Sequence, residues 1–259
     1  MAETGLSEFS IIRNLGTRFV GQRVIYYPVL PSTMEVAKLE AQKGAGEGTV
    51  IIADEQTGGK GRMKRTWLSP KGSLALSIIL RPSISYLPSL IMVACLAVVR
   101  SIEGVTPLKT EIKWPNDVLI GGKKVCGILI ESGMRQKTAD YAILGIGINV
   151  NFKASEFSQL ESIATSLSDE LGRGVSRLSL IRKLLVEVEG LYLALKRGGP
   201  IFEEWRSRLA TLGRRVGVKS DQNTYQGIAE SVASDGSLML RQSDGSLVKI
   251  VAGDVSLHE

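Results

Sequence analysis

The sequence predicts an α+β fold in which helices flank a mixed β-sheet, with a small antiparallel β-barrel domain at the C-terminus. Two observations lead to this expectation. Up to about residue 212, apolar runs of strand length alternate with longer helical segments. From Gly213 onward, short alternating strands are separated by the turns SDQN, SDG and SDG, which is typical of a small barrel or sandwich. We therefore expect one domain over residues 1–212 and a second over 213–259.

Each expected element has its own local signal. Apolar runs predict strands at residues 24–29, 49–55, 73–80, 111–120, 125–132 and 141–150. The polar stretches GGKK (121–124) and MRQKTAD (134–140) predict hairpin turns. Helices are expected at 34–43, 86–103 and 176–196, and around Trp205. In the second domain the expected strands are VGVKS, TYQGIAESVA, SLMLRQ and SLVKIVAGDVSL.

The composition indicates a globular protein with a local excess of positive charge. The 259 residues are 44% hydrophobic and 22% charged, which does not suit a disordered chain. The net charge is +6, and segment 57–66 alone carries four cations and no acid. Such a local excess suits a compact anionic ligand better than a long nucleic-acid track.

Cysteine and histidine usage narrows the possible chemistry. Cys95 and Cys126 stand in apolar contexts, so we expect two buried thiols and a reducing, cytoplasmic location. The longest apolar run, 90–99, is about half a membrane span and predicts a buried helix, with no membrane partner. The single histidine, His258, is the penultimate residue, which leaves no histidine for a catalytic triad or a zinc site in the body of the chain.

The most informative segment is TGGKGRMKRTWLSPKG, residues 57–72. Its glycines let backbone N–H groups approach an anion, and its Lys and Arg side chains can donate charge-assisted hydrogen bonds to it. We expect this loop to be mobile until an anion orders it. The alternative is a solvated basic turn, and the segment matches neither a Walker A motif nor G-x-G-x-x-G.

Three further motifs place polar groups near apolar strands. Ser32 and Glu35 form an S-x-x-E capping box, or the Ser32 hydroxyl serves a polar ligand at the helix N-terminus. KWPND (113–117) puts a proline in an extended run and gathers groups suited to a polyphosphate and Mg²⁺; its alternative is an edge-strand bulge. The hairpin after it returns Lys124 and Gly127 to the same neighbourhood, where Lys124 is otherwise a surface turn lysine.

The motifs together resemble the biotin protein ligase family, also called biotin–[acetyl-CoA carboxylase] ligases. They are PSTMEVA, ADEQTGGKGRMKRTWLSPKGSLALSIILRP, KWPNDV, GGKKVCGILIE and GIGINVN, in the family's order, and the C-terminal segment is similar too. The resemblance covers roughly residues 24–258. It implies that biotin and ATP give biotinyl-5′-AMP and pyrophosphate, and that a lysine of a biotin carboxyl carrier protein then takes the biotin.

The resemblance also implies roles for individual residues, motif by motif. Arg62, Lys113 and Lys124 are expected to be catalytic. Asp117 is the expected ligand of Mg²⁺. Trp67 is a pocket wall, a loop anchor or an ordinary core residue. The biotin-binding set is Ser32, Thr33, Met34, Gln56, Lys60, Gly61, Arg62, Lys124, Gly127 and Ile128. The nucleotide-binding set is Lys113, Asn116, Asp117, Lys124 and Asn149.

Three residues depart from the family pattern. Met34 replaces a common asparagine, Lys60 replaces an arginine, and Lys64 replaces a glycine. Lys60 exchanges a planar fork for a point charge, but the cations of the reaction remain. About two dozen residues precede the first matched strand, so we expect no DNA-binding helix-turn-helix and no DNA partner. A homodimer is among the expected partners.

Three other functions compete with this interpretation. A lipoate or octanoate ligase or transferase shares the related fold, although KWPND and the small C-terminal domain favour biotin. A nucleic-acid-binding module would use the basic loop, but only 5% of residues are aromatic and several lie in expected strands. An adenylate-binding protein without catalysis is the third, and the retained lysines and Arg62 argue against it.

Overall fold

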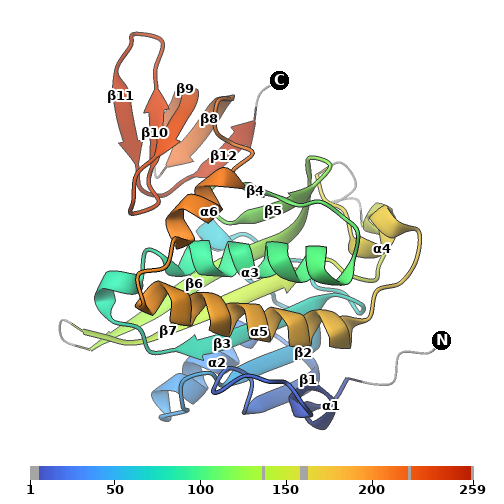
Figure 1. Cartoon of the computed structure of the whole chain (residues 1–259). Helices are drawn as coiled ribbons and strands as arrows, with labels where there is room; N and C mark the ends of the chain where they lie inside the picture. Colours follow the sequence, from blue (N-terminus) through green and yellow to red (C-terminus); the bar gives the residue numbers. More distant parts are fainter. Residues whose placement is uncertain (1–5, 136–137, 158–162, 221–222, 258–259) are drawn as a thin grey trace.

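The computed structural model describes residues 6–135, 138–157, 163–220 and 223–257 (Figure 1). His258, the tip of the 134–140 hairpin and part of the SDQN turn lie outside these residues. Within them, the larger sheet has seven strands in the order β1-β2-β3-β7-β6-β5-β4. Only the β1–β2 pair is parallel among the described ladders of this sheet, which confirms the predicted mixed sheet. The strands are β1 (Val24–Leu30), β2 (Val50–Gln56), β3 (Leu74–Leu80), β4 (Glu111–Lys113), β5 (Asp117–Ile120), β6 (Lys123–Arg135) and β7 (Thr138–Ile148).

Helices cover both faces of this sheet. α3 (Leu90–Val105) and α5 (Arg177–Lys196) pack together on one face (Figure 1), and α2 (Thr33–Gln42) packs on the other against β2, β3 and β7. The segment 90–99 is a buried helix, as predicted. Short helices α1 (Glu8–Ile12), α4 (Leu167–Leu171) and α6 (Ile201–Ser207) and the 3₁₀ turns η1 (Arg62–Lys64), η2 (Ile84–Tyr86) and η3 (Ala154–Glu156) complete the described helical segments.

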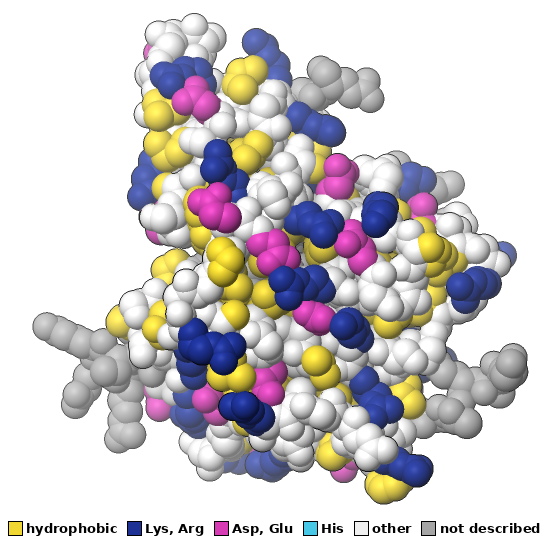
Figure 2. All heavy atoms as spheres, in the orientation of Figure 1, with side chains coloured by type: hydrophobic (Ala, Val, Ile, Leu, Met, Phe, Trp, Pro, Cys, Tyr) yellow, Lys and Arg dark blue, Asp and Glu magenta, His cyan; other side chains and the backbone are white. Residues whose placement is uncertain are grey.

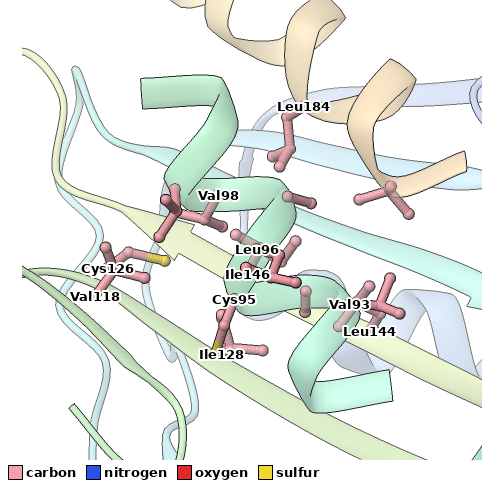
Figure 3. Packing of buried hydrophobic residues seen from close by; sticks show 14 of the residues in the cluster. Val93, Cys95, Leu96, Val98, Val118, Cys126, Ile128, Leu144, Ile146 and Leu184 are labelled. Atoms are coloured by element: carbon pink, nitrogen blue, oxygen red, sulfur yellow. The ribbon is translucent and has the colours of Figure 1, made fainter. Parts of the chain in front are cut away.

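The main core lies between α3 and the sheet. Figure 3 shows Cys95 of α3 facing the sheet, with Cys126 and Ile128 of β6 in the same cluster. Both cysteines are buried, as predicted, and burial raises the pKa of each thiol. A raised pKa keeps them protonated at neutral pH, so they act as small apolar side chains.

The predicted strand that contains the KWPND motif is divided in the structure. The run 111–120 forms β4 and β5, joined by a turn at Trp114-Pro115-Asn116. Proline lacks the N–H that a ladder needs, and here it stands in the turn of an antiparallel hairpin instead of in a strand. The GGKK turn leads into β6 with both Gly121 and Gly122 at positive φ, as a tight hairpin turn requires.

The C-terminal residues form a second, antiparallel sheet. Its strands are β8 (Arg215–Ser220), β9 (Asn223–Val232), β10 (Leu238–Arg241), β11 (Leu247–Ile250) and β12 (Asp254–Leu257), in the order β11-β10-β9-β8-β12. The predicted last strand divides at residues 251–253, and its second half pairs with β8. Outer strands β11 and β12 share no bridge in the described part of the chain, so the expected barrel is an open sheet there.

The side chain of Trp114 joins the two sheets. Its Nε1 donates to the Gly236 carbonyl at 2.8 Å, and its backbone N–H donates to Thr211 Oγ1 at 2.9 Å. The indole is 1% exposed. The KWPND motif therefore has a structural function between the sheets. Separately, every helix in the described residues is too short or too polar to span a bilayer.

Candidate functional site

A cavity of about 260 Å³ opens on the α2 side of the larger sheet, beneath the glycine-rich loop. It is lined by the start of α2, the end of β2, loop residues 60–63 and 65–68, strands β3, β5, β6 and β7, and residues 253–254 next to and in β12. The predicted site residues in its wall are Ser32, Thr33, Met34, Gln56, Lys60, Gly61, Arg62, Asn116, Asp117, Lys124, Gly127, Ile128 and Asn149. Lys113 is the predicted residue that is absent from the described lining.

One end of the cavity is a corner of buried hydroxyl and amide groups. Ser77 Oγ donates to Thr33 Oγ1 at 2.9 Å, and Gln56 Oε1 accepts from the Thr33 backbone N–H at 2.8 Å. Ser32 is 1% exposed, and within the described residues its hydroxyl has no hydrogen-bond partner. The predicted capping box is wrong, since Ser32 makes no side-chain cap and Glu35 pairs with Lys60. A buried hydroxyl without a partner is suited to a ligand.

Two glycines form a slot for the indole of Trp67. Gly127 of β6 and Gly147 of β7 are paired in register, and a Cβ on either residue would collide with the Trp67 ring. For Gly127 the nearest ring atom would lie 2.8 Å from that Cβ. Trp67 Nε1 is buried and has no partner among the described residues. The structure therefore makes Trp67 a wall of the cavity, held by a floor without side chains.

Lys124 and Asp117 form an ion pair beside this wall. Lys124 Nζ lies 2.6 Å from Asp117 Oδ1 and 5.4 Å from the centroid of the Trp67 ring. Asp117 is 8% exposed, and Oδ1 accepts no well-aligned hydrogen bond within the described chain. The lysine is thus fixed between a carboxylate and an aromatic face. The alternative interpretation of Lys124, a lysine of a surface turn, is therefore wrong.

Arg62 is held by the turn that follows β4. Its Nη1 donates to Asn116 Oδ1 at 2.9 Å, and Asn116 Nδ2 donates to the Ile128 carbonyl at 2.8 Å. Desolvation lowers the pKa of Arg62, against the attraction of Asp117 and Asp254. An arginine pKa starts so high that the guanidinium stays charged. The amide of Asn116, in the KWPND motif, therefore orients the Arg62 cation of the glycine-rich loop.

The glycine-rich loop is also pinned to α2. Lys60 forms an ion pair with Glu35, and the hydrogen bond from Lys60 to Glu35 raises the pKa of the lysine. Inside the loop, the Gly61 N–H donates to the Arg65 carbonyl at 2.8 Å and the Trp67 N–H donates to the Gly59 carbonyl at 2.9 Å. These contacts fix the loop at the wall of the cavity.

Two predicted residues contribute in a different way from that expected. Ile128 lines the cavity, but its side chain lies in the core beside α3 (Figure 3), so its backbone is what faces the site. Asn149 is 2% exposed, and its Nδ2 donates to the Thr165 carbonyl at 2.9 Å. That bond holds the segment at residues 163–165, of which Ile163 and Ala164 line the cavity.

Comparisons with known proteins identify the family. Residues 26–149 match the biotin/lipoate A/B protein ligase family, and residues 211–258 match the biotin protein ligase C-terminal domain. The chain is 39% identical over 258 residues to the bifunctional ligase/repressor BirA of Bacillus subtilis, covering 97% of this chain and 79% of that protein. This chain belongs to the biotin protein ligase family. It is accordingly a ligase, as the resemblance implied.

Further relatives agree with the assignment of this chain to the biotin protein ligase family. The biotin–[acetyl-CoA-carboxylase] ligase of Mycobacterium tuberculosis is 33% identical over 231 residues, covering 85% of this chain and 84% of that protein. Among solved structures, the biotin protein ligase from Aquifex aeolicus in complex with biotin and ATP matches with a TM-score of 0.79 and 28% identity. That match covers 92% of this chain and 99% of the other.

Several residues of the ligase's cavity were not among the predicted site residues. Gly145 lies under Met34, and its place two residues before Gly147 is a signal that was available, because alternate residues of a strand share one face. Gly253 and Asp254 also line the cavity, and Arg65 Nη2 lies 2.5 Å from Asp254 Oδ2. No local pattern marks Asp254, because its neighbours in space are far away in sequence.

The charged groups in the ligase's described cavity wall are unbalanced. The cations are Lys60, Arg62, Arg65 and Lys124, and the carboxylates are Asp117 and Asp254. Such an excess in a partly enclosed site attracts anions. The described residues contain no group of three or more His, Cys, Asp or Glu side chains that could hold a metal ion by themselves. A Mg²⁺ ion carried by phosphates needs only one or two protein carboxylates, which Asp117 can supply.

Proposed function

We propose that this chain joins biotin to ATP to give biotinyl-5′-AMP and pyrophosphate, and then transfers biotin to a lysine of a biotin carboxyl carrier protein. The observation that carries this proposal is a single cavity with two chemically different ends. One end is a corner of buried hydroxyl groups, where Ser32 Oγ has no partner among the described residues, and the other end contains Arg62, Arg65 and Lys124. Biotin has a neutral polar ring system and an anionic tail, so it matches both ends.

The hydroxyl corner binds the ring system of biotin in this proposal. Ser32 supplies a hydroxyl that has no partner among the described residues. Ser77 holds the Thr33 hydroxyl, and the Thr33 N–H holds the side-chain oxygen of Gln56. Gln56 therefore keeps its amide nitrogen as a donor for the ligand. Met34 and the glycines of β6 and β7 give the valeryl chain an apolar path along Trp67.

The cationic end brings two mutually repelling anions together. A carboxylate oxygen of biotin attacks the α-phosphorus of ATP, a P–O bond forms, and the bond to pyrophosphate breaks. Lys124 neutralises the carboxylate and the α-phosphate, and Arg62 with the backbone of Gly61 holds the loop over them. In the second step an acceptor amine attacks the acyl carbon and AMP leaves. Positioning and electrostatic stabilisation carry both steps, so a protein nucleophile is unnecessary.

Asn116, Asp117 and Asn149 form the nucleotide side of the proposed site. Asn116 aims Arg62, Asn149 secures the rim at residues 163–165, and Asp117 is the carboxylate available to Mg²⁺ bound by ATP. When bound, the metal ion supplies charge neutralisation for the phosphates. Lys113 belongs to β4, outside the described lining, and we propose that it attracts phosphates from there.

The direct test is biotin transfer by purified protein. The chain is mixed with biotin, Mg-ATP and a biotin carboxyl carrier domain, and the product is detected with avidin. We expect a labelled carrier whose acceptor lysine is modified, and no label when that lysine is replaced by arginine. Absence of label with an active carrier, or equal label without ATP, would contradict the proposal.

Lipoate is the substrate to test against biotin. The matched family includes lipoate ligases, whereas the C-terminal match is specific to biotin protein ligases. We expect lipoate to give no transferred product under conditions where biotin does. Efficient lipoyl transfer with no biotin transfer would favour the other substrate.

A nucleic-acid-binding module has less support. On the face shown in Figure 2, Lys and Arg side chains are interspersed with Asp and Glu over both sheets, which does not suit a polyanionic track. We further propose a cytoplasmic location, where two buried thiols stay reduced. A homodimer is a separate proposal that sedimentation with and without biotin would test.

A further inference from the structure

The loop that covers the cavity is tied to the second sheet by one ion pair. Arg65 Nη2 of the loop lies 2.5 Å from Asp254 Oδ2 of β12. Arg65 lies in the loop and Asp254 in the second sheet, and most of the chain separates them in sequence. Both residues also line the cavity, so the ion pair is part of the site wall.

Asp254 lies in a paired strand, whereas Arg65 lies in a loop. Asp254 is the first residue of β12 and is paired with Lys219 of β8, and the next residue, Val255, is 2% exposed and anchors the strand. Gly253 before it packs so tightly on Val218 that an added Cβ would lie 2.8 Å from a methyl group. Arg65 follows a single 3₁₀ turn that contains Met63 at φ 53°. A fixed carboxylate thus faces a cation on an irregular loop.

We propose that Asp254 is a positioning residue that holds the glycine-rich loop closed through Arg65, so that the C-terminal sheet controls how fast the acyl-adenylate escapes. This rests on the proposed function. Biotinyl-AMP is reactive towards any lysine, and a closed loop protects it from water and from the wrong acceptors.

The charge arrangement explains why the loop needs this carboxylate. Closure brings Arg62 and Arg65 to the mouth of a cavity that already contains Lys124. Like charges repel, and Asp117 is already paired with Lys124. Asp254 attracts both arginines. It forms the ion pair with Arg65, and its charge also opposes the lowering of the Arg62 pKa. Without Asp254, closing the loop would concentrate positive charge with Asp117 as the remaining carboxylate of the described cavity wall.

The expected effect is modest because the pair is partly exposed. The Arg65 side chain is 62% exposed and that of Asp254 is 35% exposed. Exposed ion pairs contribute little to an equilibrium, so we expect the release rate to change about two- to fivefold. The contribution should also shrink as salt screens the pair.

The test measures release of adenylate that has already formed. Radiolabelled biotin and Mg-ATP are incubated with the protein, excess unlabelled biotin is added, and loss of bound label is followed at low and high salt. The variants are Asp254→Asn, Arg65→Gln and the exchange of Arg65→Asp with Asp254→Arg. Glu230→Gln is the matched control, because it breaks the exposed Arg241–Glu230 pair, 2.7 Å long, elsewhere in the same sheet.

We expect Asp254→Asn and Arg65→Gln each to release adenylate about two- to fivefold faster, with loss of the salt dependence seen in the unaltered protein. Bystander lysines should be labelled more, the exchanged pair should recover much of the slow release, and Glu230→Gln should behave as the unaltered protein. Unchanged release in both single variants would overturn the inference alone. Absence of adenylate in the unaltered protein would instead overturn the proposed function.

Discussion

Ser32 carries the clearest residue-level sign of a ligand. Its hydroxyl is buried at the start of α2, and no described residue bonds to it. A buried hydroxyl without a partner costs about 1–3 kcal/mol, and a ligand that pairs with it recovers that free energy. The unliganded protein already carries this free-energy cost. The Ser32 hydroxyl should therefore strengthen ligand binding without stabilising the fold.

Replacing Ser32 should therefore separate binding from stability. We expect Ser32→Ala to weaken biotin binding by about five- to tenfold while the thermal unfolding midpoint stays level or rises, as one lost hydrogen bond of about 1 kcal/mol predicts. Calorimetric titration and thermal denaturation measure the two quantities. Ser73→Ala is the control, because the Ser73 hydroxyl is equally buried and unpaired in the described structure but lies outside the cavity wall. Equal binding by both variants would remove Ser32 from the site.

Lys124 should matter more for chemistry than for affinity. Because charge develops at the carboxylate and the α-phosphate, Lys124→Ala should slow adenylate formation by about 100- to 1,000-fold, a range typical of lost electrostatic stabilisation. Biotin affinity should change far less. Rapid-quench measurement of adenylate and titration of biotin give the two numbers. A large loss of affinity with normal turnover of the bound ligand would place Lys124 in binding only.

At the element scale, the paired strands β6 and β7 form the floor of the site. Glycines at facing positions leave room for Trp67, and Trp67 in turn faces Lys124. A methyl group on this floor would therefore move the wall and the lysine together.

A single methyl group tests the floor. Gly147→Ala should displace the indole and weaken biotin binding by more than about tenfold, since overpacking typically costs 1–3 kcal/mol. Trp67 fluorescence should shift in the same variant. Gly190→Ala is the control, because a Cβ there meets nothing within 4 Å and alanine favours the middle of a helix. Normal binding by Gly147→Ala would show that the slot is not needed.

Elements were more predictable than their interruptions. Periodic apolar runs predicted the strands and the helices α2, α3 and α5, because burial of one face imposes a local pattern. The proline of KWPND indicated an interruption, but the hairpin turn at Trp114-Pro115-Asn116 was not predicted. The division at residues 251–253 was missed, since both halves of that run have strand composition. The short helices α1 and α4 have five residues each, too few for a periodic signal.

The site divides in the same way. Ser32, Gln56, Lys124 and Gly127 were predicted because motifs keep them in fixed local contexts, and the structure brings them to one cavity. The links Arg62–Asn116 and Arg65–Asp254 were not predictable, because they join segments that meet only after the sheets have packed. The Ser32 cap was predicted wrongly: the Ser32 side chain makes no cap bond in the described structure, and Glu35 pairs with Lys60.

At the scale of the whole molecule, Trp114 and Asp254 connect the two sheets around the cavity. Trp114 is buried and donates to Gly236, whereas Asp254 reaches the exposed loop. The Trp114–Gly236 contact should fix the position of the second sheet. That position then places Asp254 within reach of Arg65 in the loop.

Trp114→Phe should therefore loosen the second sheet. The change keeps an aromatic body but loses the hydrogen bond to Gly236, at a cost of about 1–3 kcal/mol for the carbonyl left unpaired. Hydrogen exchange should quicken in β8 to β12 more than in α3 and β3, which serve as the internal reference. Uniform quickening across both sheets would mean that Trp114 supports the entire fold and not this junction.

The central claim is that the cations of one cavity allow two anions to form a mixed anhydride without help from an acceptor. The most direct measurement is pyrophosphate release by purified protein given biotin and Mg-ATP alone. We predict a rapid burst that stops when each molecule holds one biotinyl-AMP, and a much smaller burst for Lys124→Ala. Continuous ATP hydrolysis to ADP, or no pyrophosphate above that seen without biotin, would contradict it.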